Sequence, residues 1–190
     1  MIRYLREMWT MLSRITGTRE TEFKDLAERV IPRLGGTAAL PGGFSGAVEK
    51  LVGSLGRSRG QRGQMAIVSG ASSSTLSVAG AVALRLDRTL YRVIPDALTG
   101  QYIGETEKNL ATLLAGAGNE SILLFFDEAD ALFGKRGDVP DTDEQQAYLE
   151  TGYFLEQLEQ SPAMALFGTR RPPELDDEQR KHFAAMAEVT

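Results

Sequence analysis

The chain has 190 residues, of which 42% are hydrophobic and 25% charged, the composition of an ordinary soluble globular protein with one principal domain. Its formal net charge of −5 argues against a protein that gathers nucleic acid over its surface, because phosphate binding requires clustered Lys and Arg. The sequence has no cysteine, which excludes disulfides, zinc–thiolate sites and thiol nucleophiles and makes the cytoplasm the expected location.

The N-terminal stretch MIRYLREMWTMLSRITG, residues 1–17, predicts an amphipathic helix. It lacks the features of a secretory signal, and no run in the chain reaches the roughly 18 apolar residues of a membrane span. We favour a terminal helix packed on its own domain over a membrane anchor or a helix that docks on a partner. A second helix is expected from Thr18 to Pro32, so that residues 1–36 form a helical segment and residues 37–190 an α/β core.

Beyond this segment, short apolar runs typical of buried strands alternate with helical patterns. This alternation predicts an α/β fold in which a mainly parallel sheet is covered by helices on both faces. Ligands of such sheets bind beyond the carboxyl ends of the strands. The expected strands are residues 65–69, 89–94, 122–126 and 164–168, and the expected helices are residues 45–55, 77–86, 105–114 and 142–160, with an exposed basic linker at 56–63.

Two carboxylates follow the most strand-like run, ILLFF, at Asp127 and Glu128. At a strand tip, one carboxylate can hold Mg²⁺ and the next can polarise an attacking water. The alternative is that both acids cap the turn at residues 129–132. A loop that begins at Gly70 lies earlier in the chain, before the helix and strand that precede these acids. The order of the loop and the acids favours the magnesium interpretation.

The loop in question is VSGASSSTLS, which has the length of a phosphate loop, G-x-x-x-x-G-K-[ST]. In that alignment Gly70 is the first glycine, Ser74 precedes the second, Thr75 replaces the second, Leu76 replaces the lysine and Ser77 keeps the hydroxyl. Leucine cannot offset the roughly four negative charges of a nucleoside triphosphate, and a charge-assisted contact is worth about 1.5–3 kcal/mol. Tight binding of ATP is therefore not expected, although residual Mg-ATP binding through these positions stays an alternative.

Two longer segments, QYIGETEKNL at Gln101–Leu110 and ILLFFDEADALFG at Ile122–Gly134, are similar to the core of AAA+ ATPases. The resemblance is to bacterial members close to the AAA clade and covers roughly residues 40–183. It implies a P-loop NTPase-like three-layer αβα fold whose chemistry is hydrolysis of ATP with Mg²⁺. The tetrapeptide DEAD also occurs in RNA helicases, but the first segment does not fit them.

The resemblance also assigns roles to individual residues. Asp127 matches the carboxylate for Mg²⁺, and Glu128 matches the catalytic base, here expected to be vestigial. Tyr102, Ile103 and Gly104 match the first pore loop, whose aromatic side chain grips a translocating polypeptide in a hexameric ring. The alternative for Tyr102 is a buried tyrosine in a turn.

Further positions depart from the family pattern. Arg170 stands where the family has an asparagine that positions water, and Lys181 and His182 stand where arginine fingers would follow the leucine–aspartate pair at 175–176. His182 is expected on the surface and not in catalysis. The chain also ends without the family's helical lid. An arginine finger alone is worth about 10³–10⁵ in rate, so the combined losses argue against efficient hydrolysis.

Together these features favour a degenerate AAA+ domain, a pseudo-ATPase that serves as an accessory, regulatory or structural protein-binding subunit. The expected partner is an active AAA+ ATPase or a larger complex, with a homo-oligomer open and nucleic acid excluded. No cofactor is expected, unless the site retains ATP and Mg²⁺. The alternative is a slow or partner-activated Mg-ATP-binding ATPase, and a third hypothesis is a structural subunit whose residues 1–17 touch a membrane.

Overall fold

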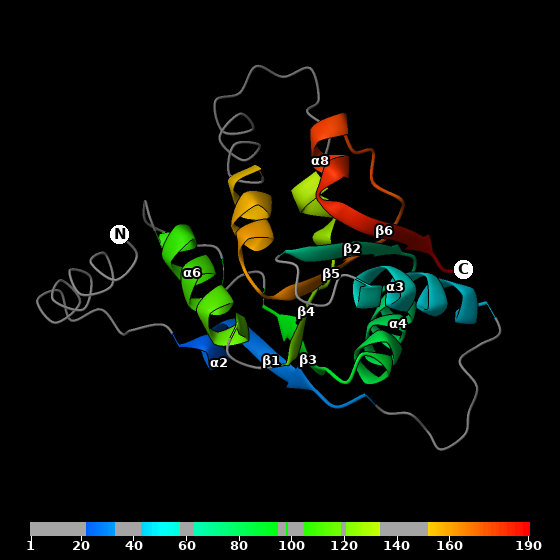
Figure 1. Cartoon of the computed structure of the whole chain (residues 1–190), viewed down its shortest axis with the longest axis horizontal. Helices are drawn as coiled ribbons and strands as arrows, with labels where there is room; N and C mark the ends of the chain where they lie inside the picture. Colours follow the sequence, from blue (N-terminus) through cyan, green and yellow to red (C-terminus); the bar gives the residue numbers. More distant parts are fainter. Residues whose placement is uncertain are drawn as a thin grey trace, which may run out of the picture.

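The computed structural model describes residues 22–32, 43–57, 63–94, 98, 105–118, 121–133 and 152–190. Its centre is a six-stranded sheet in the order β1-β3-β4-β5-β2-β6 (Figure 1). Neighbouring strands run parallel, except that β1 is antiparallel to β3. The strands are β1 Ala27–Val30, β2 Gln64–Ser69, β3 Thr89–Val93, β4 Ile122–Phe126, β5 Met164–Thr169 and β6 Phe183–Glu188.

Helices cover both faces of this sheet. Figure 1 shows α3 and α4 on one side and α6 on the other. Side chains of α3 and α4 form one buried cluster, and those of α6 and of the helical residues 152–160 form a second. The three-layer αβα fold predicted from the sequence is therefore confirmed. The helices are α2 Phe23–Leu26, α3 Ser45–Arg57, α4 Ser72–Arg85, α6 Glu105–Gly118, the 3-10 helix η1 Ala129–Phe133 and α8 Asp177–Lys181.

Strand β4 shows why the apolar runs form central strands. All five of its residues are buried, and successive side chains point to opposite faces of the sheet. Leu124 and Phe126 enter the cluster with α6, whereas Leu123 and Phe125 enter the cluster with α3 and α4. Each such burial is worth about 1.5–3 kcal/mol, which holds the carboxyl end of β4 in a fixed position.

The helix expected from Thr18 to Pro32 is present at Phe23–Leu26 but is wrong from Ala27 onwards. The helical residues end at Leu26, and β1 follows directly, with Ala27 paired to Val93 and Val30 to Leu90. Strand β3 offers an edge of unpaired backbone groups, and pairing along it overrides the local helical pattern. Residues 27–30 thus belong to the sheet.

The region after β5 contains two elements that the sequence pattern did not predict. Asp176 caps α8, and its carboxylate accepts a hydrogen bond of 2.8 Å from the Gln179 amide in a capping box. Strand β6 then adds to the free edge of β2 in parallel. Its end reaches the carboxyl end of β2, where the Val189 amide donates to the Ser69 carbonyl at 2.8 Å.

Some predictions lie outside the described residues. These are the helix at residues 1–17, most of the basic linker, and the first part of the helix expected at 142–160, of which residues 152–160 are helical. Within the described ranges, no helix is long and apolar enough to cross a membrane.

Candidate functional site

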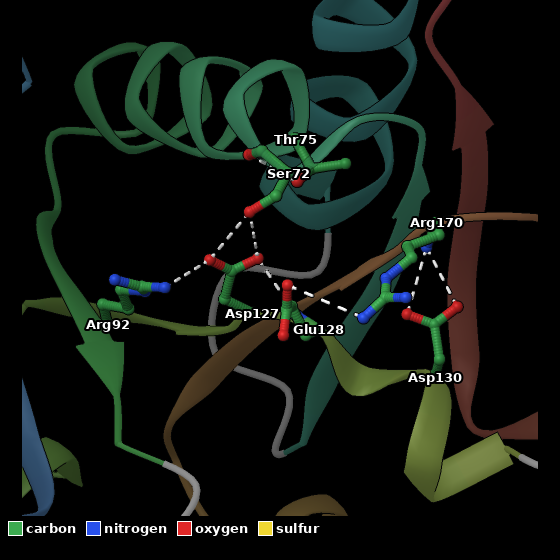
Figure 2. A network of polar contacts seen from close by, with 7 residues as sticks. All are labelled: Ser72, Thr75, Arg92, Asp127, Glu128, Asp130 and Arg170. Carbon is green, nitrogen blue, oxygen red and sulfur yellow. Dashed lines mark hydrogen bonds and ion pairs between the residues drawn. The ribbon is translucent and has the colours of Figure 1, made fainter.

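The carboxyl ends of β2, β4 and β5 bring the candidate residues together at one edge of the sheet. Gly70 follows β2, Asp127 and Glu128 follow β4, and Arg170 follows β5. Figure 2 shows the polar contacts that join the last three to one another and to the start of α4. This is the edge where ligands of doubly wound sheets bind, so we take it as the candidate site.

Asp127 is the centre of this network. Asp127 is 5% exposed, and its carboxylate accepts hydrogen bonds from two side chains and one backbone amide. The Ser72 hydroxyl lies 3.1 Å from both carboxylate oxygens, and the Glu128 amide donates to Oδ1 at 3.0 Å. The guanidinium of Arg92, on β3, donates to Oδ2 at 2.7 Å (Figure 2). A buried carboxylate requires such partners, and the short contact to Arg92 is charge-assisted.

The loop aligned with a phosphate loop is helical. Helix α4 begins at Ser72 instead of Ser77, with Ala71 as an extended N-cap residue. The amides of Ser74 and Thr75 donate to the Ala71 carbonyl at 2.8 and 2.9 Å, so they already have partners inside the protein. Gly70 has a φ of 153°, but position 75 has a threonine in place of the second glycine, and threonine does not readily take the positive φ of an open loop.

The side chains of the aligned positions also point elsewhere. Thr75 is 1% exposed, and its hydroxyl donates to the Ser72 carbonyl at 3.0 Å. Leu76 packs on the apolar cluster beneath α3 and α4. The Ser77 hydroxyl donates back to the Ser73 carbonyl at 2.7 Å. Ser74, Thr75, Leu76 and Ser77 are therefore not brought together with Asp127.

Gly70 has a packing role in this structure. A Cβ added there would lie 2.5 Å from the Val189 carbonyl oxygen and 2.8 Å from Val189 Cγ2. The Gly70 amide donates to the Thr169 carbonyl at 2.8 Å. The close approach of the segment after β6 is a sufficient reason for glycine at this position.

Glu128 faces a second part of the site. Its φ of 52° is unusual for a residue other than glycine. Its carboxylate lies 3.8 Å from Arg170 Nη2, while the Arg170 amide donates to the Asp130 carboxylate at 3.0 and 3.1 Å. These residues and Arg171 line an open hollow of about 550 Å³. All four lining residues carry charged side chains, so the hollow is polar.

The remaining candidates are not at this site or are not described. Tyr102, Ile103 and Gly104 lie outside the described residues. His182 is half-buried, and its Nδ1 lies 2.8 Å from a Glu159 carboxylate oxygen. Sequence reasoning missed Arg92. A single arginine inside the apolar run TLYRVI was the only signal for it.

The residues of this edge, as arranged, do not fit Mg²⁺ and a triphosphate. Magnesium needs open oxygen ligands near 2.0–2.1 Å, whereas the Asp127 carboxylate is taken by Ser72, a backbone amide and a cation. The described residues contain no group of three or more potential metal ligands around one point. The phosphates would find no lysine at position 76, and the amides of Ser74 and Thr75 are already bonded to the Ala71 carbonyl.

Two curated proteins are similar to parts of this chain. Fidgetin-like protein 1 of Drosophila melanogaster is 27% identical over 112 residues, which cover 56% of this chain and 21% of that protein. The 26S proteasome regulatory subunit 7 homolog of Schizosaccharomyces pombe is 36% identical over 104 residues, 52% of this chain and 24% of that protein. The matched region thus spans about a fifth to a quarter of these relatives.

Solved structures share the fold. A chain of the E. coli MS115-1 HORMA:CdnC:Trip13 complex aligns with a TM-score of 0.64 and 16% identity, over 90% of this chain and 72% of the other. The FIGL-1 AAA domain in complex with ADP aligns with a TM-score of 0.60 and 19% identity, over 86% and 57%. The family described as ATPase family associated with various cellular activities (AAA) matches residues 75–190, more than half of the chain. With its sheet order and the two carboxylates after β4, the chain belongs to the AAA family.

Proposed function

We propose that this chain is a pseudo-ATPase, an AAA domain that acts as an accessory, regulatory or structural protein-binding subunit of a larger assembly. The observation that carries the proposal is the start of α4 at Ser72, which replaces the phosphate loop by a helical turn. In this turn the amides of Ser74 and Thr75 are bonded to the Ala71 carbonyl, so a nucleotide would have to break these bonds before its phosphates met those two amides.

The energetic argument has two parts. Leu76 supplies no charge to the phosphates, and each lost charge-assisted contact costs about 1.5–3 kcal/mol, or roughly 10-fold to 100-fold in affinity. The amides of Ser74 and Thr75 are bonded to Ala71, so using them for phosphates would first break helical hydrogen bonds. Both effects lower affinity for ATP, and both act before any step of hydrolysis.

Protein binding is the activity that the remaining features support best. The sheet and its two helical layers form a rigid scaffold, and β6 lies at an edge of the sheet. A chain with a similar fold was solved as part of a HORMA:CdnC:Trip13 complex. AAA domains in general also form oligomers. An active AAA ATPase, or a larger complex that contains one, is the partner we propose, in the cytoplasm.

Isothermal titration of the full chain with Mg-ATP tests the proposal. We expect no binding tighter than about 10 μM, which corresponds to near −7 kcal/mol. The titration is repeated with Mg-ADP, because ADP carries less charge and depends less on the missing lysine. Binding of either nucleotide tighter than about 10 μM would contradict the proposal.

A slow or partner-activated Mg-ATPase is the second candidate, and one observation favours it. Glu128 remains exposed beside Arg170 at the end of β4, where a catalytic base and a substitute cation would be needed. This candidate predicts ATP turnover once a partner is added, and loss of that turnover in Glu128→Gln. Affinity purification of the full chain from its native cell supplies the partners for this assay.

The same purification separates the proposed partner classes. Recovery of an AAA ATPase or of a defined multi-protein complex supports an accessory subunit, whereas recovery of the chain alone as an oligomer supports self-assembly. Deletion of residues 1–17, followed by liposome flotation, tests the third hypothesis of membrane contact. Flotation that is lost on deletion would favour that hypothesis over a cytoplasmic scaffold.

A further inference from the structure

The Asp127 carboxylate and the Arg92 guanidinium form a pair that the family resemblance did not suggest. Asp127 is nearly fully buried, and Arg92 Nη2 lies 2.7 Å from its Oδ2. We infer that Arg92 occupies the place of the divalent cation on Asp127, so that this chain carries its own permanent cation at the carboxyl end of β4. The site is then closed to metal ions as long as Arg92 is present.

The register of the sheet places Arg92 for this role. Arg92 pairs with Phe125 of β4, and Asp127 follows two residues later in the chain. Because paired residues lie on the same face of a sheet, Arg92 and Phe125 share a face, and Asp127 follows directly after the end of β4. Strand pairing thus places the Arg92 backbone beside the end of β4, from which its side chain, 42% exposed, reaches the Asp127 carboxylate.

A second carboxylate holds the other side of the guanidinium. Glu28, on β1, pairs with Arg92 across the antiparallel strands, and its Oε1 lies 3.6 Å from Arg92 Nη1. Arg92 thus lies between an exposed acid and a buried one. The planar guanidinium suits this bridge because it presents several donors in fixed directions.

A metal ion and Arg92 exclude one another at Asp127. Magnesium coordinates oxygen at about 2.0–2.1 Å, and the Arg92 nitrogen already lies 2.7 Å from the same oxygen. Two cations at these distances from one atom would repel strongly in a buried setting. The Ser72 hydroxyl and the Glu128 amide fill the remaining acceptor positions, so a metal would have to displace several donors at once.

Titration of the full chain with Mn²⁺ in the absence of nucleotide, followed by the electron paramagnetic resonance signal of free Mn²⁺, tests the inference. We compare the wild type with Arg92→Gln, Asp127→Asn, the double variant Arg92→Gln/Asp127→Asn and a matched control, Arg29→Gln, which removes an exposed arginine of β1. Only binding that Asp127→Asn abolishes is counted, so that other acidic regions do not contribute. We expect no such binding in the wild type or the control, and a site at least tenfold tighter in Arg92→Gln.

Unfolding in urea supplies an independent measurement. A double-mutant cycle over Arg92→Gln and Asp127→Asn should give a coupling of at least tenfold in the unfolding equilibrium constant, about 1.4 kcal/mol. Arg92→Gln should destabilise more than Arg29→Gln, because it leaves a buried carboxylate without its cation. Arg92→Lys keeps a charge and should remain free of Mn²⁺, like the wild type. If Arg92→Gln does not fold, Arg92→Met, which also removes the charge, takes its place in the titration.

Wild-type binding of Mn²⁺ that disappears in Asp127→Asn would overturn the inference, as would a coupling below twofold. The inference rests on the proposed function in one respect, since both exclude Mg-ATP from this edge. Their failures can still be told apart. Mn²⁺ on Asp127 without nucleotide binding refutes the role of Arg92 alone, whereas tight ATP binding with the Arg92–Asp127 coupling intact refutes the pseudo-ATPase alone.

Discussion

The backbone of Val189 lies against Gly70, and a Cβ on Gly70 would stand 2.5 Å from the Val189 carbonyl oxygen. Two segments far apart in the chain thus meet where a phosphate loop would begin. The contact is backed by the hydrogen bond from the Val189 amide to the Ser69 carbonyl. The end of β2, with Gly70, and the residue that follows β6 are consequently packed against each other.

Gly70→Ala should destabilise the fold by about 1–3 kcal/mol, because the new methyl group overlaps backbone that cannot rotate away. Urea unfolding measures the change. Gly46→Ala is the matched control, since a Cβ there meets nothing within 4 Å and Gly46 lies in α3, where alanine is favoured by about 0.5–1 kcal/mol. Equal stability of Gly70→Ala and the wild type would contradict the packing role of Gly70.

The double substitution Thr75→Gly with Leu76→Lys restores the sequence motif of a phosphate loop. It should nevertheless raise the affinity for Mg-ATP less than threefold. The reason is that the amides of Ser74 and Thr75 are already bonded within α4, and Asp127 still holds Arg92. Isothermal titration against the wild type measures the change. A gain of tenfold or more would mean that the two side chains alone, and not the backbone, set the affinity.

Phe167→Ala should cost about 3–5 kcal/mol of the free energy of unfolding. Phe167 is fully buried and has ring contacts with four other phenylalanines, the closest being Phe126 with centroids 4.8 Å apart. Tyr153→Ala is the control, because Tyr153 is 44% exposed and should cost less than about 1 kcal/mol. Similar losses for both variants would contradict the placement of Phe167 at the centre of the cluster.

Asp176→Ala removes the cap of α8 and should cost about 1 kcal/mol. Hydrogen exchange should show faster exchange of the Gln179 amide, whose partner is the Asp176 carboxylate. Asp177→Ala, one residue further along, keeps the capping box and serves as the control. Unchanged exchange at Gln179 in Asp176→Ala would show that the cap does not hold this turn.

The sequence alone located the four central strands β2 to β5 and two acids of the candidate site, because their signals are local. ILLFF can bury five successive side chains only between two helical layers, and the acids follow it directly. Arg92 could not be assigned in this way. Its contact with Asp127 depends on how β3 pairs with β4, and that register is set by the whole sheet.

Two other errors have similar causes. The residues 27–30 have a helical pattern, but the edge of β3 recruits them as a strand, which no local window can detect. The Ala-, Val- and Leu-rich pattern of residues 77–86 predicts a helix that begins at Ser77, whereas α4 begins at Ser72. Serine and threonine at residues 72–75 instead form the first turn of the helix, whose hydrogen bonds replace those that a loop would offer to a ligand.

Phe125 and Phe126 are neighbours in the chain but lie in different hydrophobic clusters. The only covalent path between those clusters at this point is a single peptide unit of β4. Truncating both rings should therefore give nearly additive losses in stability, although the two residues are adjacent. The backbone of the sheet separates the two hydrophobic clusters. We therefore expect substitutions in one cluster to be tolerated without compensating substitutions in the other.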